Sequence, residues 1–141
     1  MMELKVKKAQ GDAKVPRYGH KGDAGLDLFS SVDVIVEKGK LQAIPTGIKV
    51  AIPDGYAGLI WDKSGTSLKG VHRLAGVIDS GYRGEVKVVM INLGDRPFVI
   101  DRGMKIAQML VQPIVTVHVV EAEDLDDTSR GEGGFGSTGK F

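Results

Sequence analysis

The stretch GIKVAIPDGYAGLIW, residues 47–61, carries the pattern that decides the fold. Apolar and polar residues alternate with period two over 47–52, which is typical of a β-strand with one buried face. The sequence Pro53-Asp-Gly55 favours a tight turn and ends this strand. A second apolar run follows over 56–61. Two short strands around a turn predict a protein built from β-structure.

The same alternation recurs along most of the chain. No segment has strong helical periodicity, and residues 62–70 could hold a turn of helix at most. Many short strands separated by turn signals are typical of a β-sandwich or jelly roll. We therefore predict an all-β, single-domain jelly-roll barrel over 1–121, with a flexible C-terminal arm over 122–141. Further strands are predicted over 32–37, 85–91, 97–100, 106–111 and 115–120.

The composition excludes several classes of protein. The 141 residues are 42% hydrophobic and 26% charged, and the net charge is +1, so no basic face for nucleic acid is expected. The chain contains no cysteine, which excludes disulfides and suits a reducing compartment. Neither a signal peptide nor an apolar run long enough to span a membrane is found. We expect a cytoplasmic protein that binds neither nucleic acid nor membrane.

Three short segments contain polar residues that a sandwich core does not need. Asp27 interrupts the apolar run around it, where a turn or edge carboxylate and a functional one are equally good interpretations. Ser64 and Gly65 follow Lys63 in a polar loop, which could form an anion nest, although such loops are common. Gln108 falls in a predicted strand where Val or Ile is expected, and its amide needs hydrogen-bond partners.

The segment GVIDSGYRGE, residues 76–85, lies between apolar strands and is predicted to be the tip of a β-hairpin. Asp79 and Tyr82 are three residues apart, which can place a carboxylate and a ring on one side of the loop. An ordinary turn with an aromatic lid has the same pattern. The backbone N–H and C=O groups beside such a tip are available to a ligand.

The C-terminal stretch GEGGFGSTGK, residues 131–140, contains the glycine and lysine spacing that begins a phosphate-binding P-loop. A P-loop needs a strand before it and a helix after it, whereas here an acidic run precedes and the chain stops at Phe141. A solvated glycine-rich tail is the plain alternative. The cation, the aromatic ring and the hydroxyls of this tail favour a clamp instead. The histidines, His20, His72 and His118, have no metal-ligand spacing and are interpreted as structural or surface residues.

Taken in order, five motifs resemble those of the trimeric dUTP pyrophosphatases (dUTPases). They are AGLDL (24–28), KSGTS (63–67), GVIDSGYRGEV (76–86), RGMKIAQM (102–109) and RGEGGFGSTG (130–139). The resemblance implies cleavage of dUTP between the α and β phosphates, giving dUMP and pyrophosphate, in a homotrimer with shared active sites. It implies Mg²⁺ as the cofactor. Because Mg²⁺ keeps several waters and prefers substrate phosphates, few protein carboxylates are needed.

The resemblance also assigns roles to individual residues. Asp79 matches the carboxylate that activates the attacking water, and Asp27 matches the residue that reaches the metal through water. Tyr82 matches the ring packed on deoxyribose, where a 2′-hydroxyl would clash. The remaining matches contact the substrate: the backbone of Gly76, Val77, Ile78 and Lys87 reads uracil, Lys63, Ser64, Gly65 and Gln108 bind phosphate, and Arg130, Phe135, Gly136, Ser137 and Thr138 form the arm that closes over uracil and the γ-phosphate.

Three positions depart from the common family pattern. Lys63 stands where Arg is more frequent, Thr66-Ser67 stands where Leu-Ala is common, and Gly81 replaces a common Asp. Two alternatives share the fold. A dCTP deaminase would need a glutamate at the position of Val89, and valine cannot shuttle protons. A non-catalytic binding module would not need Asp79 together with Asp27.

Overall fold

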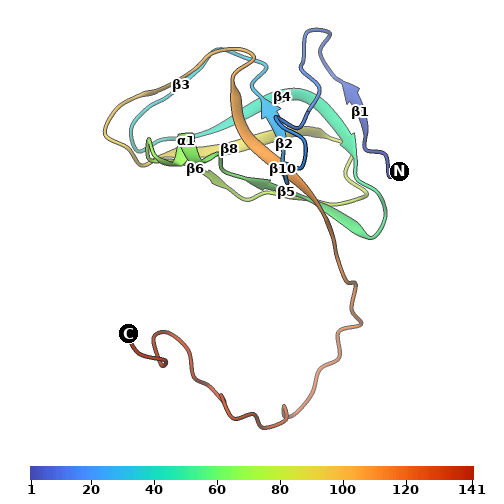
Figure 1. Cartoon of the computed structure of the whole chain (residues 1–141), viewed down its shortest axis with the longest axis vertical. Helices are drawn as coiled ribbons and strands as arrows, with labels where there is room; N and C mark the ends of the chain where they lie inside the picture. Colours follow the sequence, from blue (N-terminus) through green and yellow to red (C-terminus); the bar gives the residue numbers. More distant parts are fainter.

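The computed structural model describes all 141 residues and is almost entirely β-structure. Its elements follow from the alternating pattern of the sequence, with one four-residue helix between strands (Figure 1). That helix is far too short to cross a membrane. The elements are β1 (Lys5–Lys8), β2 (Leu26–Phe29), β3 (Val34–Val36), β4 (Leu41–Ala51), β5 (Tyr56–Trp61), α1 (Ser64–Ser67), β6 (Val71–Leu74), β7 (Val77–Ile78), β8 (Glu85–Asn92), β9 (Phe98–Ile100) and β10 (Lys105–Pro113).

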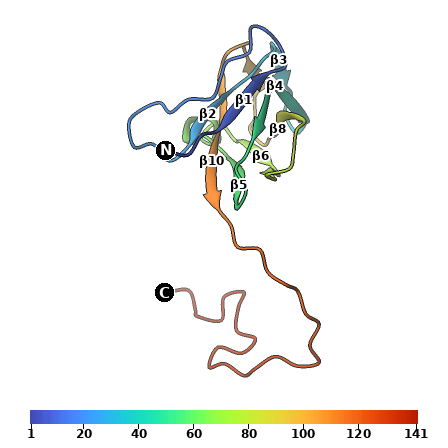
Figure 2. The ribbon, with the colours of Figure 1, turned by 90° about the vertical axis from the view of Figure 1, so that its right-hand side faces the viewer.

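The strands form a jelly-roll sandwich of two four-stranded sheets and one small one. The first sheet has the order β1-β4-β8-β6 and the second β2-β10-β5-β7, while β3 pairs with β9. All strand pairs are antiparallel. Figure 2 shows the sheets stacked with their strands running roughly along the barrel. The predicted all-β fold is confirmed.

The core fills the space between the two large sheets. It is one cluster of 19 buried residues, to which β4, β8 and β10 contribute their inward-facing side chains. On β8, Val86, Val88 and Met90 are each at most 2% exposed, and the residues between them face outward. This is the period of two that the sequence predicted.

Strand β4 is longer than the sequence predicted and begins at Leu41 instead of Gly47. Pro45 and Gly47 hide the strand in the sequence, because proline and glycine normally weaken strands. In the structure they lie at an irregularity, where the register between β4 and β8 shifts between Pro45 and Lys49. Strands β1, β2, β6 and β7 are four residues or shorter and were not predicted as strands.

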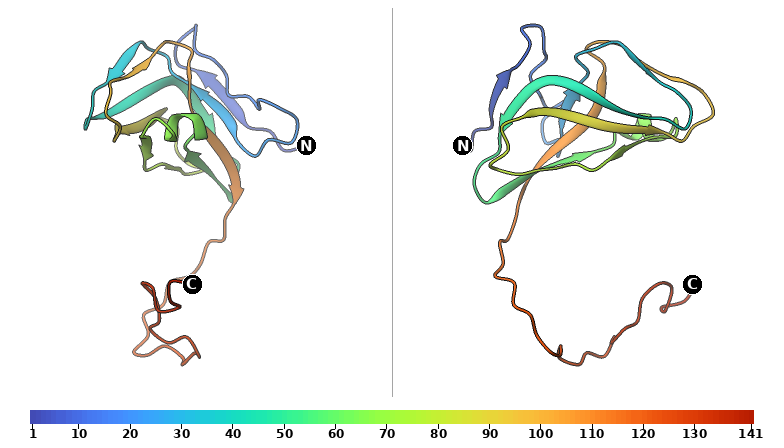
Figure 3. Two further views of the ribbon diagram at one scale, coloured as in Figure 1. Left: turned by 60° about the vertical axis from the view of Figure 1, so that its left-hand side comes forward. Right: turned by 180° about the vertical axis from the view of Figure 1, so that it is seen from behind.

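The predicted strand over 115–120 is wrong for the isolated chain. Strand β10 ends at Pro113, and the last backbone hydrogen bond to the barrel runs from Ile114 N to Gly55 O at 2.9 Å. Beyond it the chain leaves the barrel and extends away in every view (Figures 1 and 3). The valines of 115–120 are exposed, because the chain offers them no neighbouring strand.

Candidate active site

The segment 76–85 joins the two large sheets and is not the tip of a closed hairpin. Strand β6 pairs with β8 only from Val71 to Leu74, and the chain then crosses so that β7 pairs with β5. The predicted hairpin is therefore open at its end. The opening forms a pocket of about 620 Å³, whose lining residues include Gly76, Val77, Ile78, Asp79, Tyr82 and Lys87.

We call this 620 Å³ pocket the base pocket. Two free strand edges face it. Strand β7 uses one edge to pair with β5, and β8 pairs with β4 over 85–88 while its other edge has no partner strand. Backbone donors and acceptors at such edges have a fixed spacing and are strong hydrogen-bonding groups. The base pocket can therefore recognise a flat, polar ring by its hydrogen-bond pattern.

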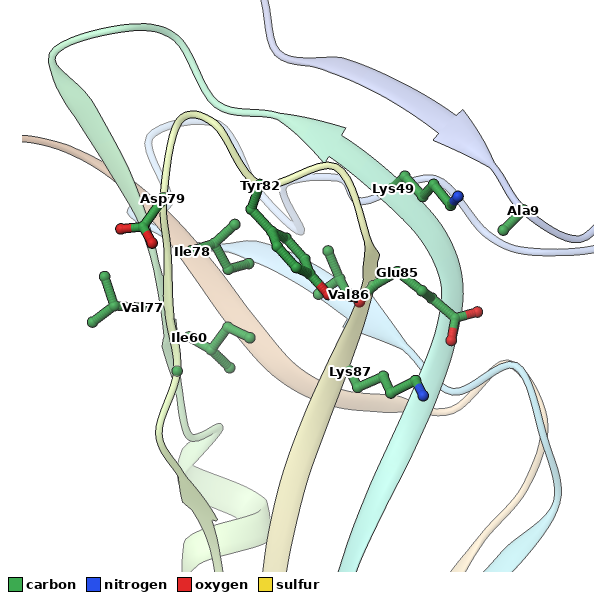
Figure 4. Close-up of a pocket in the computed structure, with 11 residues that line it drawn as sticks. Ala9, Lys49, Ile60, Val77, Ile78, Asp79, Tyr82, Glu85, Val86 and Lys87 are labelled. Atoms are coloured by element: carbon green, nitrogen blue, oxygen red, sulfur yellow. Dashed lines mark hydrogen bonds between the residues drawn. The ribbon is translucent and has the colours of Figure 1, made fainter.

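The ring of Tyr82 closes one side of the base pocket. Its hydroxyl donates to the carbonyl of Glu85 at 2.9 Å, and its backbone N–H donates to the carbonyl of Asp79 at 3.1 Å. Arg83 fixes the same loop by donating from Nη1 to the carbonyls of Ser80 (2.7 Å) and Tyr82 (2.9 Å). Figure 4 shows the Tyr82 ring lying between the two strands. The loop is therefore held in shape by its own side chains.

Asp79 lines the base pocket and is exposed. It takes part in none of the five ion pairs of the chain. In Figure 4 its carboxylate points away from the Tyr82 ring, so the two side chains line one pocket without facing the same side of the loop. An exposed carboxylate with no partner has both oxygens available to a water and to a substrate.

A second pocket, of about 520 Å³, lies beside α1 and has no lining residue in common with the base pocket. It is lined by residues that the motifs predict to contact phosphate, namely Lys63, Ser64, Gly65 and Gln108. Thr66 and Ser67 donate their backbone N–H to the carbonyl of Lys63 at 3.0 Å. The corresponding groups of Ser64 and Gly65 have no such partner and can bind an anion.

We call this second pocket the lysine pocket. Two further lysines that line it were missed by the sequence interpretation. Lys69 and Lys105 both line it, and Lys69 also lies 5.9 Å above the ring of Phe98. Lys105 belongs to the quoted motif RGMKIAQM, but nothing in its spacing marked it as a pocket residue. With Lys63 they bring three ammonium groups to one pocket. Such a pocket suits a multiply charged anion.

Asp27 is buried on β2, only 3% exposed. Its Oδ1 accepts from Lys63 Nζ at 2.5 Å, and its Oδ2 lies 3.1 Å from Lys105 Nζ. Burial alone would raise the pKa of Asp27, but the hydrogen bonds and charges of the two lysines outweigh it and hold the pKa below its usual value. The carboxylate is therefore ionised and fixes two of the pocket lysines.

The side-chain amide of Gln108 donates a hydrogen bond within the sheet. It lies between Asp27 of β2 and Trp61 of β5 in the strand register, and its Nε2 donates to the carbonyl of Asp62 at 2.9 Å. Asp62 in turn accepts from the backbone N–H of Arg73 at 2.7 Å and from His72 Nδ1. His72 is thus a structural partner, as expected. These contacts anchor the start of the loop that carries Ser64.

The arm residues are not brought to either pocket within one chain. Their hydrogen bonds are local turns, such as Arg130 Nε to the carbonyl of Gly133 at 2.8 Å and Ser137 N to the carbonyl of Gly134 at 3.1 Å. The ring of Phe135 is fully exposed. No strand precedes the stretch around Lys140, and a P-loop requires one.

The chain offers no cluster of three or more His, Cys, Asp or Glu residues that could enclose a metal ion. This donor set fits a hard cation such as Mg²⁺ only if the ion is held mainly by ligand oxygens and water. Asp27 is ionised, but both of its oxygens are engaged by lysines. A metal-bound water could reach Asp27 only after one lysine turned away, which the flexible lysine stem allows.

Comparison with known proteins places these features in one family. A dUTPase family model matches residues 11–139. The chain is 51% identical over 141 residues to the deoxyuridine 5′-triphosphate nucleotidohydrolase of Clostridium kluyveri, covering 98% of this chain and 99% of that one. The Clostridium tetani protein of the same name is 47% identical over 140 residues, covering 97% of each chain.

Solved structures agree with this relation. The dUTPase of Staphylococcus bacteriophage 80alpha with dUPNHPP superposes with a TM-score of 0.93 at 31% identity, covering 99% of this chain and 100% of that one. A mutant dUTPase from phage phi11 of S. aureus, described with a coordinated structural Mg(II) ion, has a TM-score of 0.81 at 29% identity. That match covers 87% of this chain and 98% of the phage protein.

Proposed function

The chain belongs to the dUTPase family and hydrolyses dUTP, and on that premise we propose how its two pockets divide the substrate. The base pocket takes uracil and deoxyribose, and the lysine pocket takes the triphosphate. The observation that carries this proposal is the open pocket between the free edges of β7 and β8, with Asp79 and Tyr82 on its wall. The products are dUMP and pyrophosphate.

Uracil is read by backbone groups at the two free edges. Those of Gly76, Val77 and Ile78 lie on one side of the base pocket and that of Lys87 on the other. Cytosine reverses a donor and an acceptor on its ring, so it would leave buried polar groups unpaired. Discrimination of this kind can reach a factor of ~10⁴–10⁵.

Tyr82 excludes ribonucleotides. Its ring is anchored by the hydrogen bond to Glu85 and by the turn back to Asp79. A ring held at a fixed height fits deoxyribose and collides with a 2′-hydroxyl. The sugar selectivity therefore depends on how rigidly the loop holds the ring.

Asp79 acts as the general base. As water attacks the α-phosphorus, its proton passes to the carboxylate, an oxygen–phosphorus bond forms, and the bond to the α,β-bridging oxygen breaks. That oxygen leaves with pyrophosphate. A base placed in this way contributes ~10²–10⁴-fold, and neutralisation of the triphosphate supplies the larger part.

The triphosphate is neutralised by the lysine pocket. Ser64 and Gly65 offer backbone N–H groups, and Lys69 offers an ammonium group without a carboxylate partner. In the free chain Lys63 and Lys105 are paired with Asp27. When the substrate binds, their ammonium groups turn toward its phosphates. Lys63 contacts phosphate as a point charge, where the family's more frequent Arg would form a bidentate pair.

Mg²⁺ fits this arrangement as an ion shared with the substrate. When bound, it neutralises phosphate charge as a Lewis acid. Asp27 would contact it through water, in the place that a departing lysine leaves. The carboxylate is already ionised for this role because its pKa is lowered.

We further propose a homotrimer in which the arm of one copy closes over a site of another. Outward-facing apolar side chains line the first sheet, where Leu41 lies opposite Ile91 and Leu74 lies opposite Val89. Leu41 and Leu74 are 58% and 37% exposed. Such a face needs a cover, and closed symmetric assembly is a common one. The exposed valines of 115–120 need a neighbouring strand for the same reason.

A complementation experiment tests the shared site. An Asp79→Asn chain and a chain truncated after Thr128 are each nearly inactive alone, and they are unfolded and refolded together. If the arm crosses between copies, about one site in four combines Asp79 from the truncated chain with the arm of the other. Pyrophosphate release should then return to roughly a quarter of the parent rate. Activity no higher than that of the separate variants, with mixed trimers confirmed by mass, would contradict the crossing.

A further inference from the structure

Four cations form a basic strip beside the base pocket, and one of them, Lys49, also lines that pocket. They are Lys5 and Lys7 of β1, Lys49 of β4 and Arg83 of the loop before β8. Together they line a groove of about 340 Å³, and its remaining lining residues are Val6, Val50 and Ala51. Val50 is 2% exposed and Val6 packs against the core, so the groove presents mainly its cations to solvent. The groove opens beside the loop that carries Asp79, because Arg83 belongs to that loop.

The cations of the basic strip repel one another, and none of them forms an ion pair within the chain. Lys7 lies directly opposite Lys49 in the ladder between β1 and β4, and like charges in that position destabilise a sheet. Glu85 lies opposite Lys49 on the other side, but it forms no ion pair with it. An anionic partner would relieve this repulsion.

Protection of a sheet edge explains only part of the basic strip. Strand β1 is an edge strand, and lysines are common on such strands because they hinder aggregation. Lys49, however, belongs to the interior strand β4, and Arg83 belongs to a loop. Protection of the β1 edge against aggregation would require neither Lys49 nor Arg83.

The chain itself contains a segment of complementary charge. Five of the seven residues from Glu121 to Asp127 are acidic, and we call this segment the acidic run. It forms no hydrogen bond or ion pair with the barrel of its own chain. The seven residues 114–120 before it are mostly β-branched, so they favour an extended chain of about 23 Å. That length carries the acidic run away from its own barrel (Figure 2).

We propose that the acidic run of one copy docks in the basic strip of another copy. The proposal rests on the assembly proposed above, and it adds the surface over which the arm travels. Arg83 links this surface to the site, because the same guanidinium holds the carbonyls of Ser80 and Tyr82. Docking therefore places the following residues, 130–138, close to the substrate and raises their effective concentration there.

Disulfide trapping tests the contact directly, because the chain contains no cysteine. Ala51→Cys in the groove is combined with Leu125→Cys in the acidic run, so that every charge is retained. Leu125 is 87% exposed. The matched control combines Leu125→Cys with Ile35→Cys, which is 50% exposed on β3 and outside the groove. After mild oxidation, the groove pair should give covalently linked chains at least about tenfold faster than the control pair.

Two perturbations show whether charge drives the contact. Salt at 1 M shortens the Debye length to about 3 Å and should slow trapping of the groove pair toward the control rate. The double substitution Lys7→Glu and Lys49→Glu, made in the groove pair, should also slow its trapping toward the control rate at low salt. Trapping at the control rate in the parent background, or a product linked only within single chains, would overturn the proposal. The shared-site proposal would stand in either case, because complementation measures it separately.

Kinetics give an independent readout. Replacing Glu123, Asp124 and Asp126 by their amides should raise KM for dUTP about three- to tenfold and leave kcat nearly unchanged, since the chemistry is not touched. Because dUTP is itself an anion, the parent and the variant are compared at each salt concentration. The two KM values should converge as salt rises. An unchanged KM at low salt would contradict the docking.

Discussion

Replacing Gly84 by alanine tests how the loop positions the ring of Tyr82. A Cβ at residue 84 would lie 2.4 Å from the Tyr82 hydroxyl oxygen and 2.6 Å from its Cζ. Gly84 does not have a positive φ, so the strain falls on the ring and not on the backbone. Ordinary non-bonded carbon contacts are ~3.5–4.0 Å, so the ring must move by about 1 Å.

The consequences follow from what the ring does. Its hydrogen bond to the carbonyl of Glu85 is lost, which costs about 0.5–1.5 kcal/mol of stability. A displacement of about 1 Å at a substrate-positioning group can cost ~10²-fold in rate. We therefore expect kcat/KM for dUTP to fall by roughly 10–100-fold. The value for UTP should fall less, because the displaced ring no longer excludes the 2′-hydroxyl.

The assay is steady-state hydrolysis of dUTP and UTP by the parent and by two variants. Gly81→Ala is the matched control, because it lies in the same loop and a Cβ there would meet nothing within 4 Å. It should keep the parent's preference for dUTP. If Gly84→Ala retains the same UTP/dUTP ratio of kcat/KM as Gly81→Ala, the ring of Tyr82 is not the sugar gate.

Three further perturbations have defined outcomes. Tyr82→Ala should admit UTP relatively better than the parent, as measured by the UTP/dUTP ratio of kcat/KM, and an unchanged ratio would remove the ring from sugar selection. Gly25→Ala would place a Cβ 2.4 Å from Gln108 Oε1. This contact should displace the Gln108 amide in the lysine pocket and raise KM for dUTP several-fold. Gly11→Ala is the control, because a Cβ there meets nothing within 4 Å, and KM should be unchanged. Asp27→Asn should lower the free energy of unfolding at neutral pH by about 1–3 kcal/mol. The folded pKa of Asp27 is lowered, so the stability difference between the parent and Asp27→Asn should shrink as pH falls below the ordinary pKa of about 3.9 and through the folded pKa. Denaturant unfolding at several pH values measures this difference. A difference that stays constant with pH would contradict the role of the ionised carboxylate.

The alternating pattern was sufficient to predict the barrel, because inward-facing residues at every second position are what a buried sheet face requires. It failed where pairing depends on partners far away in the sequence. Strand β4 continues through Pro45 and Gly47 because β8 holds it in place beyond the irregularity. The segment 115–120 has the pattern of a strand but no partner within its own chain. Strand pairing depends on which segments the fold brings side by side, and the pattern within one segment does not contain that information.

The motifs named individual residues but not the surroundings in which the fold places them. Asp79 and Tyr82 line one pocket without facing the same side of the loop (Figure 4), and the opening of the predicted hairpin depends on the separate pairing of β7 with β5. The ion pairs of Asp27 could not be predicted, since Lys63 and Lys105 are 36 and 78 residues away from it in the sequence. The basic strip likewise arises from three segments that only the fold brings together.

The most direct test of the account is the hydrolysis of dUTP by Asp79→Asn. This change keeps the shape of the side chain and removes the base. Single-turnover hydrolysis should fall by at least ~10²-fold, while the dissociation constant for dUTP, measured by calorimetry, should stay within a few-fold of the parent value. Asp54→Asn, at an exposed turn position, is the matched control and should behave like the parent. Near-parental turnover by Asp79→Asn would contradict the assignment of Asp79 as the base.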